Sequence, residues 1–141
     1  MPTLQDAIAL ARQVHQGQRD KAGKPYIEHV LRVVASLDGA DDKIVGALHD
    51  VLEDSAHTAE SLRRIGYPDR IVHAVECLTK RDGEDYEHYI GRVKQDAIAR
   101  RVKIADLKDN MDMARLPTPS AIDWERLAKY QQALRQLTPS P

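Results

Sequence analysis

The stretch that decides the fold is Ala47-Leu48-His49-Asp50-Val51-Leu52-Glu53-Asp54, residues 47–54, where titratable side chains stand within an apolar helical pattern. Residues four apart lie above one another on an α-helix, so we expect His49 over Glu53 and Asp50 over Asp54. A histidine and three carboxylates beside apolar residues are unfavourable unless they are paired or bind a cation. An imidazole with a carboxylate suits Mn²⁺, Fe²⁺ or Zn²⁺. The alternative is an acidic helix end that water solvates.

The same helical spacing of apolar residues continues on both sides of this stretch. Thr3 and Asp6 form a capping pair, Thr58 caps a short helix that Gly66 ends, and Ser120 caps the last helix. We predict an all-α fold, a compact single-domain bundle over residues 1–141 with about eight helices and no strand. Including caps, the helices are expected at about residues 3–16, 26–37, 42–54, 58–66, 68–79, 85–93, 96–114 and 121–137, with Asp41 or Asp42 capping the third.

Composition narrows the class of protein. Of 141 residues, 42% are hydrophobic but none is Phe, so the core must be aliphatic, and we expect Trp124 to be a packing anchor for the last helix. The 21 basic and 22 acidic residues balance, which argues against a nucleic-acid or anionic-membrane partner. The single cysteine, Cys77, is expected to be buried and excludes an internal disulfide. Without a signal-peptide pattern or a membrane-length apolar run, a cytoplasmic protein is expected; the oligomeric state stays open.

Two further segments extend the candidate site. In Val102-Lys103-Ile104-Ala105-Asp106-Leu107-Lys108-Asp109-Asn110, Asp106 and Asn110 share one helical face, either as ligands or as a polar helix edge. His29 falls in the first turns of the second predicted helix, where it is either a core histidine or a ligand. His29, His49, Asp50 and Asp106 would make a four-ligand set from three helices, leaving metal positions open for water and substrate.

These motifs, in this order, resemble the HD superfamily of phosphohydrolases. The resemblance is closest to the hydrolase domain of RelA/SpoT enzymes and the small alarmone hydrolases, and it covers roughly residues 5–116. It is carried by Gly17-Gln18 with Lys21-Ala22-Gly23-Lys24-Pro25-Tyr26-Ile27-Glu28-His29, by Leu48-His49-Asp50-Val51-Leu52-Glu53-Asp54, by Leu78-Thr79-Lys80, and by Val102-Lys103-Ile104-Ala105-Asp106 through Asn110-Met111.

The resemblance implies a metal-dependent phosphohydrolase that holds one Mn²⁺, or another divalent transition metal, at the four ligands named above. It further implies that Glu53 and Asp54 position and deprotonate the attacking water. The implied substrate is a nucleotide, guanosine bearing a 3′-diphosphate, and the implied product is pyrophosphate. We expect five substrate contacts: Arg19, Lys21, Lys80, Lys103 and Asn110.

Two departures from the family pattern bear on the substrate. Asp20 stands where the family has a base-stacking arginine, although Arg19 is adjacent, and Leu107-Lys108-Asp109 replaces an Arg-Leu-His run. These departures leave the four expected metal ligands intact but alter the expected surroundings of the guanine base. Two alternatives therefore stand beside the alarmone hydrolase: a phosphatase for another nucleotide or small phosphate ester, and a non-catalytic nucleotide-binding sensor.

Overall fold

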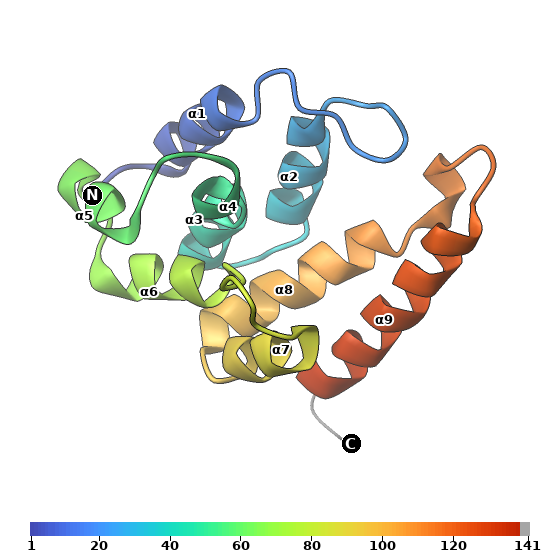
Figure 1. The fold of residues 1–141 in the computed structure, drawn as a ribbon. Coiled ribbons are helices and arrows are strands. Elements are labelled where there is room, and N and C mark those ends of the chain that lie inside the picture. Colours follow the sequence, from blue (N-terminus) through green and yellow to red (C-terminus); the bar gives the residue numbers. More distant parts are fainter. Residues whose placement is uncertain (139–141) are drawn as a thin grey trace.

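The computed structural model describes residues 1–138, which form nine α-helices and one 3₁₀ turn (Figure 1). The described residues contain no β-strand, only an isolated bridge between Arg19 and Pro25. The all-α prediction is confirmed, and the ninth helix arises because the predicted helix 42–54 is divided in two. The elements are α1 Leu4–Val14, α2 Tyr26–Ala35, α3 Ala40–Leu48, α4 Val51–Asp54, α5 Ala59–Ile65, α6 Asp69–Cys77, α7 Tyr86–Lys94, α8 Ala97–Asn110, the 3₁₀ turn η1 Met113–Arg115, and α9 Ala121–Leu137.

Local capping signals set most helix boundaries where they were predicted. Thr3, Thr58 and Ser120 each accept a hydrogen bond from the backbone N–H three residues ahead and form capping boxes. Gly66 ends α5 with a φ of +119°, a backbone conformation that favours glycine. The predicted cap at Asp41 or Asp42 is wrong, because α3 begins after Gly39.

Asp42 instead lies inside the fold as half of an ion pair between helices. Its Oδ2 atom accepts from Arg101 Nε at 2.6 Å, which ties the start of α3 to α8. The carboxylate is buried, so this pairing satisfies a charge that would otherwise be unfavourable there.

Helix α3 is the centre of the core, in contact with α1, α2, α6 and α8 (Figure 1). Its residues Ile44 to Leu48 are all buried, so it is apolar around most of its circumference. The core is built almost wholly from Val, Leu, Ile and Ala, as the absence of Phe predicts, and Cys77 is buried as expected. No helix within the described chain has the length and apolar character needed to cross a bilayer.

Helix α9 packs against α7 and α8 through Ala133 and Leu137 near its C-terminal end. The prediction that Trp124 anchors this helix is wrong, because Trp124 is 54% exposed. Nine residues separate Trp124 from the buried Ala133, which places the two side chains about 180° apart around the helix. Trp124 therefore faces away from the packed side of α9.

Candidate metal centre

The candidate site is built where the chain bends between α3 and α4. The predicted continuous helix is wrong at this point, since Asp50 has φ −108° and ψ 4° and separates the two helices. The His49 Nδ1 atom lies 2.6 Å from the carbonyl oxygen of Gly46. A carbonyl oxygen only accepts, so Nδ1 donates, and it occupies the acceptor that the Asp50 N–H would use in a continuous helix.

The bend brings donor atoms from three helices together. His29 on α2, His49 and Asp50 each offer one atom, and these atoms lie within 4.8 Å of one another. Asp106 on α8 joins them, because its Oδ1 lies 3.0 Å from His29 Nε2 and 3.4 Å from His49 Nε2. His49 Nε2 is also 3.0 Å from Asp50 Oδ2. The four residues predicted as metal ligands thus converge on one point.

The state of His49 tests whether this cluster fits a divalent cation. Its Nδ1 donates to Gly46, which leaves Nε2 as the ring nitrogen that can bind either a proton or a metal ion, and Nε2 is buried with no hydrogen bond of acceptable geometry despite its carboxylate neighbours. Burial opposes a charged ring, but the carboxylates of Asp50 and Asp106 raise the pKa of His49 well above its usual value. Positive charge is therefore favoured among these atoms, and two imidazoles with two carboxylates suit a divalent transition metal.

A second layer of contacts orients the four donors. His29 Nδ1 donates to Asp109 Oδ2 at 2.6 Å, and the Tyr26 hydroxyl donates to Asp50 Oδ2. Lys103 Nζ donates to Asp106 Oδ2 at 2.9 Å, while Asn110 Nδ2 donates to Asp106 Oδ1 at 3.1 Å. Histidine ligands commonly have their second ring nitrogen held in this way, which fixes the tautomer and the ring orientation.

The pKa shifts of these outer groups follow from their partners. Burial opposes ionisation of Asp109, but the hydrogen bonds from His29 and Arg32 hold its pKa well below the usual range. Burial likewise opposes a charged Lys103, but Asp106 raises its pKa. Burial and the nearby Asp50 raise the pKa of Tyr26, so its hydroxyl remains a donor. Each outer group is therefore held in the protonation state that its hydrogen bond requires.

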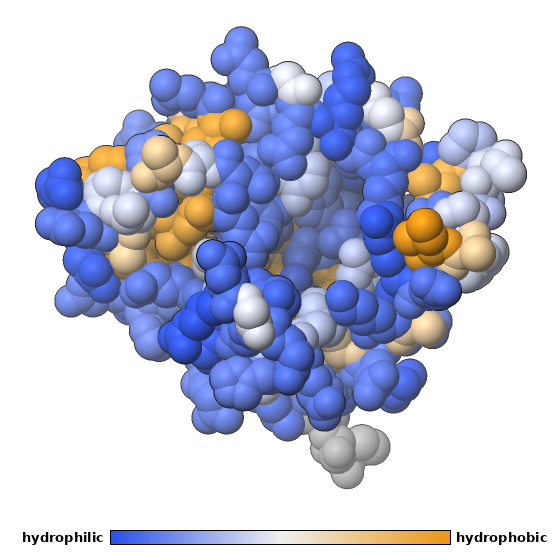
Figure 2. Space-filling model, in the orientation of Figure 1, coloured by the Kyte–Doolittle hydropathy of each residue, from blue (hydrophilic) through white to orange (hydrophobic). Residues whose placement is uncertain are grey.

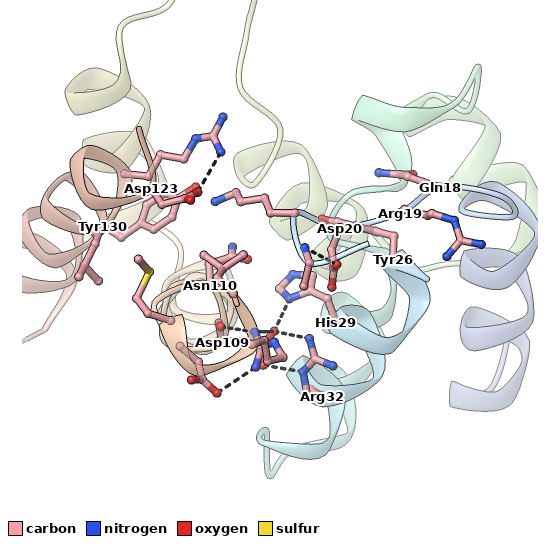
Figure 3. Close-up of a pocket in the computed structure, with 18 residues that line it drawn as sticks. Gln18, Arg19, Asp20, Tyr26, His29, Arg32, Asp109, Asn110, Asp123 and Tyr130 are labelled. Carbon is pink, nitrogen blue, oxygen red and sulfur yellow. Dashed lines mark hydrogen bonds and ion pairs between the residues drawn. The ribbon is translucent and has the colours of Figure 1, made fainter. Parts of the chain in front are cut away.

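Two pockets flank the cluster, and the face that holds them is hollowed among mainly hydrophilic residues (Figure 2). The first, which we call the loop pocket, lies between loop 17–25, α2, the end of α8 and α9 (Figure 3). The second, which we call the lysine pocket, lies between residues 49–53, the loop before α7, and α8 and α9. Asn110 and Tyr130 line both pockets, so the two spaces meet beside the cluster.

The five predicted substrate contacts divide between these pockets. Arg19 and Lys21 line the loop pocket, Lys80 and Lys103 line the lysine pocket, and Asn110 lines both. The Arg19 guanidinium donates to the Gly23 carbonyl at 2.7 Å and points away from the middle of the loop pocket (Figure 3). The Lys21 ammonium instead reaches across the pocket to within 5.2 Å of the Tyr130 ring centroid.

The two predicted catalytic carboxylates are placed apart. Glu53 lines the lysine pocket beside His49 and accepts from the Lys80 backbone N–H at 2.9 Å. Asp54 faces the other side of the short helix α4, where it accepts from Gln18 Nε2 at 3.3 Å and lies 3.6 Å from His15 Nδ1. Asp54 does not line either pocket, so of these two carboxylates only Glu53 borders the open space at the cluster.

Several site residues were missed because their partners are distant in sequence. Tyr130 and its neighbours Arg126 and Lys129 reach the pockets from α9, whereas the sequence pattern indicated only a packing face there. The spacing of Arg126 and Tyr130, four apart on one face, is the signal that was available. The Asp109 contact to His29 spans 80 positions and left no local signal.

Comparison with known proteins places this geometry in a family. The model of the HD domain family matches residues 7–115. A guanosine-3′,5′-bis(diphosphate) 3′-pyrophosphohydrolase of Aquifex aeolicus is 32% identical over 120 residues, covering 77% of this chain and 17% of the relative. A GTP pyrophosphokinase of Myxococcus xanthus is 31% identical over 127 residues, covering 77% of this chain and 16% of the relative. The chain thus spans less than a fifth of the length of these curated relatives.

A solved structure of a metazoan orthologue of SpoT, described as hydrolysing ppGpp, has the same fold. It matches with a TM-score of 0.77 at 21% identity and covers 97% of this chain and 86% of its own. The family match covers His29, the His49-Asp50 bend and Asp106, the three parts from which the cluster is built. The chain belongs to the HD domain family.

Proposed function

We propose that this chain is a divalent-metal-dependent phosphohydrolase that removes pyrophosphate from the 3′ position of a guanosine 3′-diphosphate nucleotide. The observation that carries the proposal is the convergence of His29, His49, Asp50 and Asp106 around the buried His49 Nε2, which lies beside two carboxylates but makes no hydrogen bond. The names of the Aquifex relative and of the structural neighbour support the choice of substrate.

The metal proposed for this site is Mn²⁺, held by the two imidazoles and the two carboxylates. Mixed nitrogen and oxygen donors favour a first-row transition metal over Mg²⁺ or Ca²⁺, which prefer all-oxygen sites. When bound, such an ion supplies Lewis-acid polarisation of a phosphoryl oxygen and lowers the pKa of water.

The residues around the cluster supply the remaining chemistry. Glu53 borders the lysine pocket and is the carboxylate placed to orient water and accept its proton. Lys80 and Lys129 line the same pocket, so we propose that their ammonium groups neutralise the diphosphate that leaves, while Lys103 stays paired with Asp106. Asp54 holds Gln18 and thereby the start of loop 17–25, which makes it a positioning residue in this proposal.

The loop pocket is proposed to hold the nucleoside. It carries the Tyr26 and Tyr130 rings, which give a flat base an aromatic surface, and it is continuous with the cluster at Asn110. Asp20 does not enter this pocket as a free charge, because its Oδ1 accepts from the backbone N–H groups of Ala22 and Lys24 at 2.9 and 3.0 Å. It shapes the loop where the family has an arginine.

This use of Asp20 favours a second candidate, a phosphatase for another nucleotide. A loop without the base-stacking arginine recognises guanine less specifically, while the metal cluster and Glu53 are unchanged. Release of inorganic phosphate, rather than pyrophosphate, would identify this activity.

The test is a panel of nucleotides incubated with Mn²⁺-loaded protein, with pyrophosphate and phosphate measured separately. Pyrophosphate release from guanosine 3′,5′-bis(diphosphate), absent in Asp106→Asn, is the expected result. Phosphate release from other nucleotides supports the second candidate. Tight metal-dependent binding without turnover of any substrate contradicts both and indicates a nucleotide sensor.

A further inference from the structure

A second cluster of metal-binding side chains lies at the far end of α8 from Asp106. It consists of His73 and Cys77 on α6 and Asp96, which caps the N-terminus of α8. The donor atoms of the three residues all lie within 4.8 Å of one another. Ten residues of helix separate Asp96 from Asp106, a rise of about 15 Å, so the two clusters are independent.

The donor geometry resembles that of a tetrahedral zinc centre. His73 and Cys77 are four residues apart and therefore project from the same face of α6. His73 Nε2 lies 3.6 Å from Cys77 Sγ and 3.7 Å from Asp96 Oδ2. With Zn–N and Zn–O bonds of about 2.1 Å and a Zn–S bond of about 2.3 Å, a tetrahedral ion needs donors roughly 3.4–3.6 Å apart. These two separations are thus within a few tenths of an ångström of the spacings that a tetrahedral ion needs.

The three side chains keep a donor atom for an ion. Asp96 uses Oδ1 to accept from the Ala99 N–H at 2.8 Å, while the other oxygen, Oδ2, faces His73. Cys77 is 7% exposed, and its Sγ contacts the His73 ring rather than a second thiol. Burial and the nearby Asp96 raise the pKa of Cys77, so the free thiol is protonated rather than poised as a nucleophile.

We propose that His73, Cys77 and Asp96 form a zinc-binding site, separate from the hydrolase centre, that joins the C-terminal end of α6 to the N-terminal end of α8. A thiolate, an imidazole and a carboxylate are a donor set that suits Zn²⁺. The fourth position is left to water, since the His73 side chain is 65% exposed and opens the cluster to solvent. Binding displaces the thiol proton to solvent, and no redox change is involved.

Cobalt titration separates this site from the proposed Mn²⁺ centre. Co²⁺ bound to a thiolate gives a near-ultraviolet charge-transfer band that imidazole and carboxylate ligands do not produce. The titration uses the Asp106→Asn variant of this chain, so that the hydrolase centre binds little Co²⁺. A phosphine keeps Cys77 in its reduced form. We expect a charge-transfer band that saturates at one equivalent of Co²⁺ and disappears when Zn²⁺ is added.

Three variants in the same background identify the ligands. Cys77→Ser should lose the band, while His73→Ala and Asp96→Asn should each require at least about tenfold more Co²⁺. Asn caps helices as well as Asp does, so Asp96→Asn removes the charge and keeps the cap of α8. His73 is exposed, so its variant tests the site even if Cys77→Ser does not fold. Absence of the band at saturating Co²⁺, or an unchanged midpoint in both His73→Ala and Asp96→Asn, would overturn the proposal.

Discussion

Asp109 shows how one side chain can orient a proposed metal ligand, His29, from outside the cluster. It accepts from His29 Nδ1 at 2.6 Å and from Arg32 Nε at 2.8 Å, so the carboxylate is clamped between α2 and α8. Because Nδ1 donates to Asp109, Nε2 is the ring nitrogen that His29 presents to the cluster. The family pattern has a histidine at this position, and the acidic residue here acts as an orienting group.

Removing that orienting group should weaken the metal centre. We expect Asp109→Ala to reduce Mn²⁺ affinity roughly 10–100-fold, the usual effect of losing an outer-shell partner. The measurement is calorimetric titration of metal-free protein. Asp69→Ala is the matched control, since Asp69 is an exposed carboxylate on α6 that pairs with Arg63 and lies outside the cluster and both pockets. Equal Mn²⁺ affinity in the two variants would show that Asp109 does not position His29.

The sequence predicted the residues of the cluster far better than their contacts. His29, His49, Asp50 and Asp106 were found because a family pattern carries them at fixed spacing, and the structure brings them together. Contacts such as Asp109 with His29, or Tyr26 with Asp50, join positions 80 and 24 apart. They depend on how whole helices pack, which no local pattern specifies.

At the scale of elements, the Glu84 carboxylate ties the loop before α7 to the helix that follows it. Glu84 accepts from Arg92 Nη2 at 2.9 Å and Nε at 3.1 Å, and from the Arg81 backbone N–H at 3.1 Å. These hydrogen bonds hold the pKa of Glu84 below its usual value, and the bond from Arg92 has the largest effect. The same loop lines the lysine pocket, so its order matters for the proposed diphosphate site.

The lowered pKa gives stability a defined pH dependence. A carboxylate whose pKa falls on folding stabilises the protein above its unfolded pKa of about 4.3, and this stabilisation is lost as pH falls towards the folded value. Glu84→Gln should therefore lower the melting temperature at neutral pH, and the difference from wild type should shrink as pH approaches about 3. Glu87→Gln, in the first turn of α7, is the control. A difference independent of pH would contradict the role of the Glu84 charge.

The helices themselves also differ in how tightly they are packed. At Gly46 on α3, an added methyl group would lie 2.9 Å from Leu37 Cδ1 and 3.6 Å from Val33 Cγ1. Both neighbours are buried, so the core has to move to accommodate it. At Gly91 on α7, no atom lies within 4 Å of the corresponding position.

This contrast predicts opposite effects for one substitution. Gly91→Ala should stabilise the protein by about 0.5–1 kcal/mol, the gain in helix propensity. Gly46→Ala should destabilise the protein by about 1 kcal/mol, because the free-energy cost of overpacking the core exceeds the gain in helix propensity. Urea denaturation of both variants measures the difference. An equal gain in stability at Gly46 would mean that Leu37 moves aside freely.

Helix existence and boundaries were largely predictable because the signals are local. The caps at Thr3, Thr58 and Ser120 and the stop at Gly66 depend on residues within four positions. The bend at His49-Asp50 was missed, because the apolar spacing runs through it and only the His49 contact to the Gly46 carbonyl interrupts the helix.

On the scale of the whole molecule, the fold gathers the site from helices that meet around α3. Helix α2 supplies His29, the α3–α4 bend supplies His49 and Asp50, and α8 supplies Asp106. Figure 1 shows how these helices are arranged. Helix α9 completes both pockets from the opposite side with Tyr130. The orientation of α9 was not predictable, because an amphipathic pattern identifies the apolar side of a helix but not the helices that pack against that side. The exposed Trp124 illustrates this limit.

The central claim is that this arrangement holds one catalytic divalent metal, and anomalous diffraction tests it most directly. Crystals of wild-type protein and of Asp106→Asn, grown with Mn²⁺, would be measured on both sides of the manganese absorption edge. We predict one strong manganese peak in the wild type, about 2.0–2.3 Å from His29 Nε2, His49 Nε2 and the carboxylates of Asp50 and Asp106, which is lost or greatly weakened in the variant. A wild-type map with no manganese peak among these four residues would contradict the account.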